Sequence, residues 1–129
     1  MKKVLLIDDD NSINKLNQII LSRVVNEPIE ITSFNKASNA LESIINDKDE
    51  KHIIFLDVNM PMMSGWDFLQ ALKDQDILAN KEVYMLTSSV DPRDEERALN
   101  EFKINGFAVK PLTFDLVKAR FGHLFELKN

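Results

Sequence analysis

Short apolar runs alternate with longer segments of helical spacing along the whole chain. Five runs have the length and side chains of strands: 4–7, 29–34, 53–56, 83–86 and 106–109. Between and after them, apolar residues recur at spacings of three and four, which is typical of one face of a helix. Strands that alternate with helices at this period indicate a parallel sheet covered by helices on both faces. We therefore predict an α/β fold of five strand–helix units.

Each predicted helix has an apolar stripe that should face the sheet. The stripes are Ile13, Leu16, Ile19, Ile20 and Val24; Ala37, Ala40, Leu41, Ile44 and Ile45; Trp66, Leu69 and Leu72; Ala98, Leu99 and Phe102; and Phe114, Val117, Phe121 and Leu124. Asn11 or Ser12 can cap the first helix, which should run to about Val25. Asp91 and Thr113 are suited to cap the fourth and fifth helices.

The number of strand–helix units and the length of the chain limit the possible topologies of the sheet. A chain of 129 residues suits one domain, and we expect residues 1–129 to form a single domain without an output domain. Five units in one small domain favour a flavodoxin-like three-layer sandwich with strand order 2-1-3-4-5. The glycine pattern that opens a dinucleotide-binding helix does not occur, so a nicotinamide site has no support.

Composition excludes several classes of protein. Hydrophobic residues make up 44% of the chain, which is enough for a core, and cysteine is absent, so disulfides and thiolate metal sites are excluded. The net charge is −5 without a basic cluster, so we expect no direct binding of nucleic acid. No apolar run has the length of a membrane span, and the first residues do not resemble a signal peptide. We expect a cytoplasmic protein without a membrane partner.

Polar side chains follow four of the five predicted strands. Asp8 and Asp9 follow the first strand, Asp57 the third, Thr87 the fourth and Lys110 the fifth. The carboxyl ends of parallel strands meet at one edge of the sheet, so these side chains should converge. Carboxylates without histidine or cysteine favour Mg²⁺, with Mn²⁺ as an alternative. Together with a lysine and a hydroxyl, they predict a site where a carboxylate attacks a phosphoryl group in line.

The same residues carry a resemblance to a known family. From residue 2 to about residue 126, the chain resembles the receiver domain of two-component response regulators, through the motifs Asp8-Asp9, Asp57-x-x-Met60-Pro61-x-x-x-Gly65, Thr87 and Lys110-Pro111. Each of these motifs is weak alone, but together, in the right order at the right strand ends, they make this resemblance specific. The turn after Asp57 contains Pro61, which fixes its own φ, and Gly65, which permits backbone conformations that other residues avoid.

The resemblance implies a role for each acidic residue. Asp57 would be the phospho-acceptor, taking a phosphoryl group from a phosphohistidine of a sensor histidine kinase or histidine phosphotransfer protein. Asp9 and Asp57 would bind Mg²⁺ directly, together with the backbone carbonyl of Asn59, and Asp8 largely through water. Asn59 and Ser89 would flank the route of the hydrolytic water. No organic cofactor is implied.

The resemblance also implies a switch. Lys110 would pair with Asp57 at rest and with the phosphoryl oxygens after transfer, and its bond to Pro111 would be cis. Thr87 would swing toward the phosphoryl group, and Phe107 would turn inward into the vacated space. The surface formed by the fourth helix, fifth strand and fifth helix would then change, and an unknown downstream protein would read that change.

The chain departs from the family pattern at three positions. Lys103 stands where the family often has glycine at the end of the fourth helix, so Asn105 could cap this helix instead. Phe107 replaces the commoner tyrosine. Asp10 is an additional acid to which the sequence assigns no role.

Other functions compete with signalling on the same kind of fold. A haloacid-dehalogenase-like phosphatase would use Asp8 and Asp10 as its nucleophile motif, but it needs a later acidic pair and leaves Asp57 without a role. A flavin-binding module needs hydroxyl and glycine donors after the first strand, where three aspartates would repel a phosphate. A receiver-like scaffold that no longer takes phosphate would not need the complete set of site residues. We expect no enzymatic activity beyond the chain's own phosphorylation and dephosphorylation.

Overall fold

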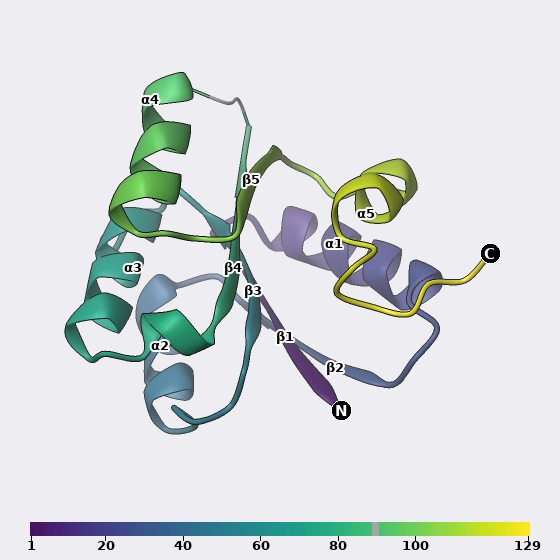
Figure 1. Ribbon diagram of the computed structural model, residues 1–129, viewed down its shortest axis with the longest axis horizontal. Helices are drawn as coiled ribbons and strands as arrows, with labels where there is room; N and C mark the ends of the chain where they lie inside the picture. The colour runs from purple at the N-terminus through teal and green to yellow at the C-terminus, as the bar shows by residue number, and fades with distance from the viewer. Residues whose placement is uncertain (89–90) are drawn as a thin grey trace.

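Five parallel strands form one sheet, and helices follow the strands along the chain. The computed structural model describes residues 1–88 and 91–129. The strand order is β2-β1-β3-β4-β5, so the predicted flavodoxin-like topology is confirmed (Figure 1). The elements are β1 Lys2–Ile7, α1 Asn11–Val24, β2 Ile29–Phe34, α2 Ala37–Ile45, β3 Ile53–Asp57, α3 Gly65–Asp74, η1 Leu78–Asn80, β4 Glu82–Thr87, α4 Pro92–Glu96, η2 Arg97–Glu101, β5 Gly106–Val109 and α5 Phe114–Arg120.

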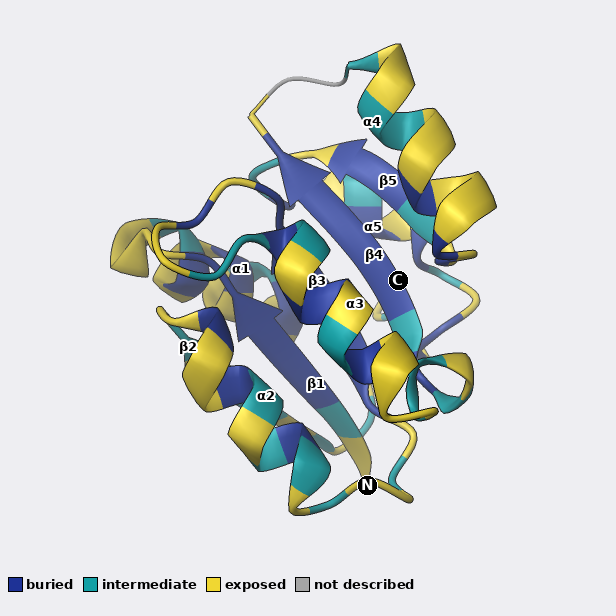
Figure 2. Ribbon diagram, turned by 90° about the vertical axis from the view of Figure 1, so that its left-hand side faces the viewer, coloured by how far each residue is buried: buried dark blue, intermediate teal, exposed yellow. Residues whose placement is uncertain are grey.

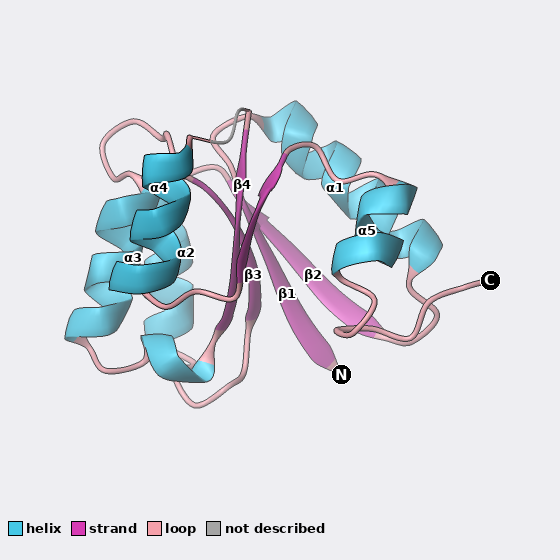
Figure 3. Cartoon of the chain, turned by 45° about the horizontal axis from the view of Figure 1, so that its top comes forward, coloured by secondary structure: helices cyan, strands magenta, loops and turns pink. Residues whose placement is uncertain are grey.

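The helices form one layer on each side of the sheet. Helices α2, α3 and α4 cover one face, and α1 and α5 cover the other (Figures 1 and 3). A separate apolar core fills each space, and the central strands β1, β3 and β4 are buried almost throughout (Figure 2). In the described part of the chain, no helix is long and apolar enough to cross a membrane.

The register of the sheet brings the carboxyl ends of the strands to one edge. Strand β1 pairs with β3 so that Ile7 lies opposite Leu56, and β4 pairs with β5 so that Thr87 lies opposite Val109. The residues that end or directly follow these strands therefore lie at nearly the same position along the strand direction. This is the edge where an α/β sheet of this order holds its ligands.

Helix α1 presents a different face to the sheet from the one predicted. The buried positions include Asn14 and Asn17, whereas Leu16 and Ile19 remain 40% and 38% exposed. The helix is capped by Asp10, not by Asn11 or Ser12: the Asp10 carboxylate accepts hydrogen bonds from the backbone N–H groups at positions 12 and 13. The additional acid therefore has a structural role as an N-cap.

The end of α4 also differs from the prediction. Leu99 is 39% exposed, whereas Phe102 is buried. The last turn, η2, is a π-helix, and the extra residue in that turn moves the apolar stripe. Lys103 has a φ of 55°, in the left-handed region that glycine adopts more readily than other residues. Asn105 does not cap the helix, because its Oδ1 accepts a hydrogen bond from the backbone N–H of Val83 on β4.

Helix α5 is shorter than its apolar stripe predicts. It ends at Arg120, and Phe114 at its first position is 45% exposed, although Leu124 beyond the helix is buried. The following tail turns back to the end of α1, where Leu127 forms an antiparallel bridge with Val25. The buried leucine is thus supplied by the tail and not by a longer helix.

Candidate functional site

Three carboxylates meet at the carboxyl edge of the sheet. Asp8, Asp9 and Asp57 each offer one oxygen, and these three oxygens lie within 4.8 Å of one another. We call this group the acidic triad. Asp8 and Asp57 are both only 4% exposed, whereas Asp9 is open to solvent. Hard oxygen donors without nitrogen or sulfur fit Mg²⁺ or Mn²⁺, so the donor set matches the predicted metal.

Lys110 reaches the acidic triad from the end of β5. Its Nζ donates a hydrogen bond to Asp8 Oδ2 at 2.8 Å and lies 3.5 Å from Asp57 Oδ1. The sequence predicted Asp57 as its partner at rest, and the nearer carboxylate is Asp8. Burial alone would lower the pKa of the Lys110 ammonium, but its hydrogen bond to Asp8 and the negative charges of both carboxylates raise that pKa above its ordinary value.

The environment of Asp57 opposes its negative charge. Burial, and then the neighbouring charge of Asp8, raise the pKa of the Asp57 carboxyl to about 6, although Lys110 and a backbone hydrogen bond from Asn59 act in the opposite direction. A carboxylate under this repulsion is stabilised when a cation joins the site. The acidic triad therefore combines a suitable donor set with a physical reason to bind a cation.

Asp8 is held in place by its backbone and its side chain. Its N–H donates to the carbonyl of Phe34 at 3.1 Å, and its Oδ1 accepts from the N–H of Asp10 at 2.9 Å. Asn14 Nδ2 donates to the carbonyls of Asp8 and Phe34, at 2.9 and 3.2 Å. The end of β1 is thus tied to both β2 and α1, which fixes one member of the acidic triad.

The loop after Asp57 passes very close to the end of β3. The N–H of Gly65 donates to the carbonyl of Val58 at 2.8 Å, and a Cβ at Gly65 would lie 2.5 Å from the Asp57 carbonyl oxygen. Gly65 does not adopt positive φ, so the conformational freedom of glycine is not used at this position. Lack of space, and not backbone conformation, requires glycine here. The positive φ occurs instead at Met62, with a value of 69°.

Thr87 and Phe107 lie on the same face of neighbouring strands. Thr87 ends β4 with 5% exposure, and its carbonyl accepts a hydrogen bond from the N–H of Lys110 at 2.7 Å. Phe107 pairs with Met85 across the sheet, and residues two apart on a strand share a face, so Phe107 and Thr87 are diagonal neighbours. Phe107 is buried in this structure, at 5% exposure, and belongs to the apolar core on this face of the sheet.

Sequence reasoning missed Asn17, a further residue beside the site. Its side chain is 3% exposed, and its Oδ1 accepts a hydrogen bond from the N–H of Leu112 at 2.9 Å. This bond ties α1 to the segment that follows Lys110 and Pro111, whose peptide bond is cis as expected. The available signal was a pair of asparagines three residues apart on one helix. Ser89 lies outside the described residues.

Comparisons with known proteins cover nearly the whole chain. Residues 4–121 match the family model described as Response regulator receiver domain. The chain is 25% identical to the chemotaxis protein CheY of Pseudomonas aeruginosa, over 98% of each protein. It is 26% identical to the transcriptional regulatory protein PcoR of Escherichia coli, over 93% of this chain and 50% of PcoR. A solved two component response regulator from Cytophaga hutchinsonii has a TM-score of 0.80 at 30% identity, over 95% of this chain and 96% of that one.

Proposed function

Because the chain belongs to the response regulator receiver domain family, we propose that it accepts a phosphoryl group on Asp57 and thereby switches a protein-binding surface. Proteins of this family are generally signalling proteins, not enzymes, and work with histidine kinases. The donor in our proposal is a phosphohistidine on a sensor histidine kinase or a histidine phosphotransfer protein. Residues 1–129 act as one receiver domain.

The observation that carries this proposal is the meeting of Asp9, Asp57 and Lys110 at one edge of the sheet, from three different strand ends. One Asp57 oxygen attacks phosphorus, and a P–O bond forms as the P–N bond to the histidine ring breaks. The electron pair of the broken bond remains on the ring. Lys110 keeps its positive charge beside the phosphoryl oxygens, and the Thr87 hydroxyl donates a hydrogen bond to one of them.

The metal in this proposal is held by the chain's own oxygens. Asp9, Asp57 and the backbone carbonyl of Asn59 bind Mg²⁺ directly, Asp8 acts largely through water, and Mn²⁺ is an alternative ion. When bound, the ion neutralises negative charge on the phosphoryl group. The repulsion that raises the pKa of Asp57 supports this requirement, because it weakens as positive charge enters the site.

The output in our proposal is a change of surface on α4, β5 and α5. Thr87 moves toward the phosphoryl group, and Phe107 occupies the space that it leaves. Their position as diagonal neighbours on β4 and β5 supports this coupling. A downstream protein that binds one of the two conformations of this surface more tightly then shifts the equilibrium between them. A difference of a few kcal/mol in its binding free energy for the two conformations suffices for a clear signal.

The competing phosphatase reading is weaker than the signalling one. It requires Asp10 beside Asp8 as a catalytic acid, but the Asp10 carboxylate accepts two backbone hydrogen bonds at the start of α1 and is not part of the acidic triad. Sustained hydrolysis of p-nitrophenyl phosphate that survives Asp57→Asn and stops with Asp10→Asn would favour the phosphatase.

The test of the proposal is phosphorylation by a small donor. After incubation with acetyl phosphate and Mg²⁺, intact mass should show one added phosphoryl group on the wild type. A chelator or the substitution Asp57→Asn should abolish it, because each removes a part of the site. Asp49→Asn, in the exposed loop after α2, is the matched control and should be labelled like the wild type. Equal labelling of Asp57→Asn would refute the assignment.

A further inference from the structure

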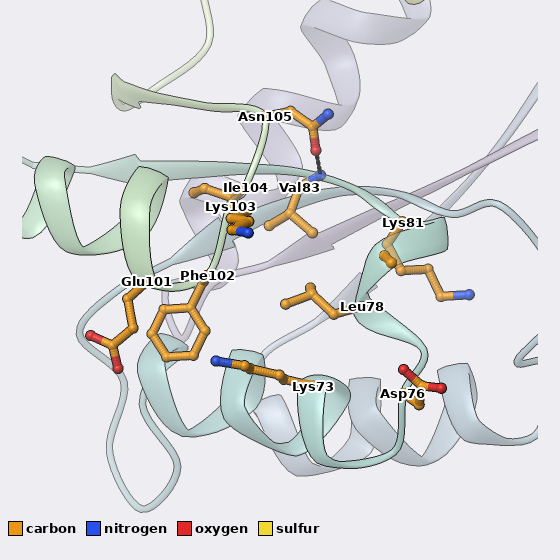
Figure 4. A pocket seen from close by; sticks show the side chains of 11 residues that line it. Lys73, Asp76, Leu78, Lys81, Val83, Glu101, Phe102, Lys103, Ile104 and Asn105 are labelled. Atoms are coloured by element: carbon orange, nitrogen blue, oxygen red, sulfur yellow. Dashed lines mark hydrogen bonds between the residues drawn. The ribbon is translucent and has the colours of Figure 1, made fainter.

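A pocket of about 430 Å³ lies at the opposite edge of the sheet from the acidic triad. It is bounded by the end of α3, by η1, by the start of β4 and by the connection between η2 and β5 (Figure 4). We call it the basal pocket and define it by Lys73, Leu78, Val83, Phe102, Lys103 and Ile104. We propose that the basal pocket binds a small aromatic carboxylate, independently of phosphorylation.

One part of the basal pocket wall is apolar. Val83, Phe102 and Ile104 belong to the core and are 1%, 4% and 7% exposed, and the half-buried Leu78 faces them from η1 (Figure 4). The volume lies within the range of small-molecule sites, which are mostly apolar and carry a few polar groups that orient the ligand. The walls therefore suit the ring system of a ligand.

The two lysines of the basal pocket supply unpaired positive charge. Lys73 and Lys103 form no ion pair with any residue in the described ranges. Lys73 Nζ lies 5.7 Å from the centre of the Phe102 ring, so one ammonium already adjoins the aromatic wall. In a chain with a net charge of −5, two cations beside apolar walls favour an anion with an apolar body.

The other charged groups around the pocket do not cancel the positive charge of Lys73 and Lys103. The ammonium of Lys81 points away, where it donates to the carbonyls of Lys48 and Glu50 at 2.8 and 2.6 Å. Glu101 at the rim pairs with Arg97, whose Nε lies 3.4 Å from its carboxylate. Asp76 is the remaining acid, and it opposes an anionic ligand. One acid thus faces two unpaired lysines.

Two rim residues allow a test that separates charge from folding. Lys103 and Asp76 have φ values of 55° and 58°, which glycine adopts with less strain than other residues. Lys103→Gly and Asp76→Gly should therefore both raise the melting temperature. The first removes a cation and the second an anion, so their effects on the affinity for a carboxylate should be opposite.

The probe is 2-naphthoate, added to the 129-residue chain and followed by amide ¹H–¹⁵N NMR, with neutral 2-naphthamide as the matched ligand. We expect saturable shifts at Val83, Phe102 and Ile104. Lys103→Gly should weaken binding about two- to fivefold, the range of one exposed ion pair, and Asp76→Gly should tighten it.

Three outcomes would overturn the proposal. The first is equal affinity for 2-naphthamide, which would leave the lysines without a role. The second is a shift pattern centred on the acidic triad or on α1. The third is an equal change of affinity in both glycine variants. Acetyl phosphate labelling of Asp57 should be unchanged in both variants, so failure here and failure of the phosphorylation proposal are distinguishable.

Discussion

Met62 holds a backbone conformation that its side chain does not favour. It has a φ of 69° in the loop after Asp57, and its side chain is fully exposed, so packing does not compensate for the strain. The substitution Met62→Gly should raise the free energy of unfolding by about 1 kcal/mol. Urea denaturation measures this directly. Met63→Gly, in the same loop but without positive φ, is the control and should lower stability; a gain in both variants would contradict the explanation.

At the scale of residues, sequence reasoning located the carboxylates better than their contacts. Asp8, Asp9 and Asp57 were found because each follows an apolar strand, and the topology brings strand ends together. The preference of Lys110 for Asp8 was not foreseeable, because it depends on differences of less than 1 Å between two oxygens of similar reach. The role of Asp10 could have been predicted from its place just before a helix.

At the scale of elements, the bounds of α1 followed from the sequence but its buried face did not. A pattern of apolar residues ranks side chains only by how favourably they leave water. It therefore predicted that Leu16 and Ile19 would be buried. Asn14 and Asn17 are buried instead, because they make hydrogen bonds to backbone groups in the segments that follow β1 and β5. Such bonds satisfy polar groups that burial would otherwise leave without partners.

The contact between α1 and the segment after β5 gives a prediction at this scale. Asn17→Ala should leave the buried N–H of Leu112 without an acceptor and lower the free energy of unfolding by about 1–3 kcal/mol. If Lys110 acts as proposed, labelling by acetyl phosphate should also slow, because the segment that follows it loses a tie to α1.

Gln18→Ala, at an exposed position of the same helix, is the matched control and should match the wild type in both measurements. Wild-type stability in Asn17→Ala would show that Leu112 finds another partner. Wild-type labelling rates in a destabilised Asn17→Ala would restrict Asn17 to a structural role.

At the scale of the whole molecule, the alternation of strands and helices was enough to predict one parallel sheet and its order. The end of the chain was less predictable. The stripe from Val117 to Leu124 suggested a continuous helix, but the structure buries Leu124 after a turn and pairs the tail with Val25. A helical period cannot distinguish these arrangements, since both bury the same leucine.

The stability of the whole fold should depend on pH through His52, which directly precedes β3 at the edge of the sheet opposite the acidic triad. His52 is 3% exposed, and burial, followed by the positive charge of Lys81, lowers its pKa. Lys3 acts in the same direction, whereas Asp47 and Glu50 raise the pKa. The native state therefore binds fewer protons than the unfolded chain below about pH 6.5. This contribution to stability is complete above that pH and is lost as the pH falls.

Compared with His52→Gln, which cannot titrate, the wild type should lose unfolding free energy as the pH falls from 7 to 5.5, because the lowered pKa of His52 makes the unfolded chain bind more protons than the native state. Urea denaturation at several pH values measures the difference. The comparison with the variant is needed because the raised pKa of Asp57 increases the unfolding free energy of both proteins as the pH falls, which opposes the effect of His52. Parallel curves for the two proteins would show that His52 is not responsible.

The contact between α3 and the end of α4 has a practical consequence. Trp66 is the single tryptophan of the chain; its ring lies 4.4 Å from the Arg97 guanidinium carbon and stacks on Phe102 at 5.9 Å. Its emission therefore originates from one known helix–helix contact. Any partner or modification that displaces η2 and Phe102 from α3 should change the wavelength and intensity of that emission, so the unlabelled protein reports this movement by its own fluorescence.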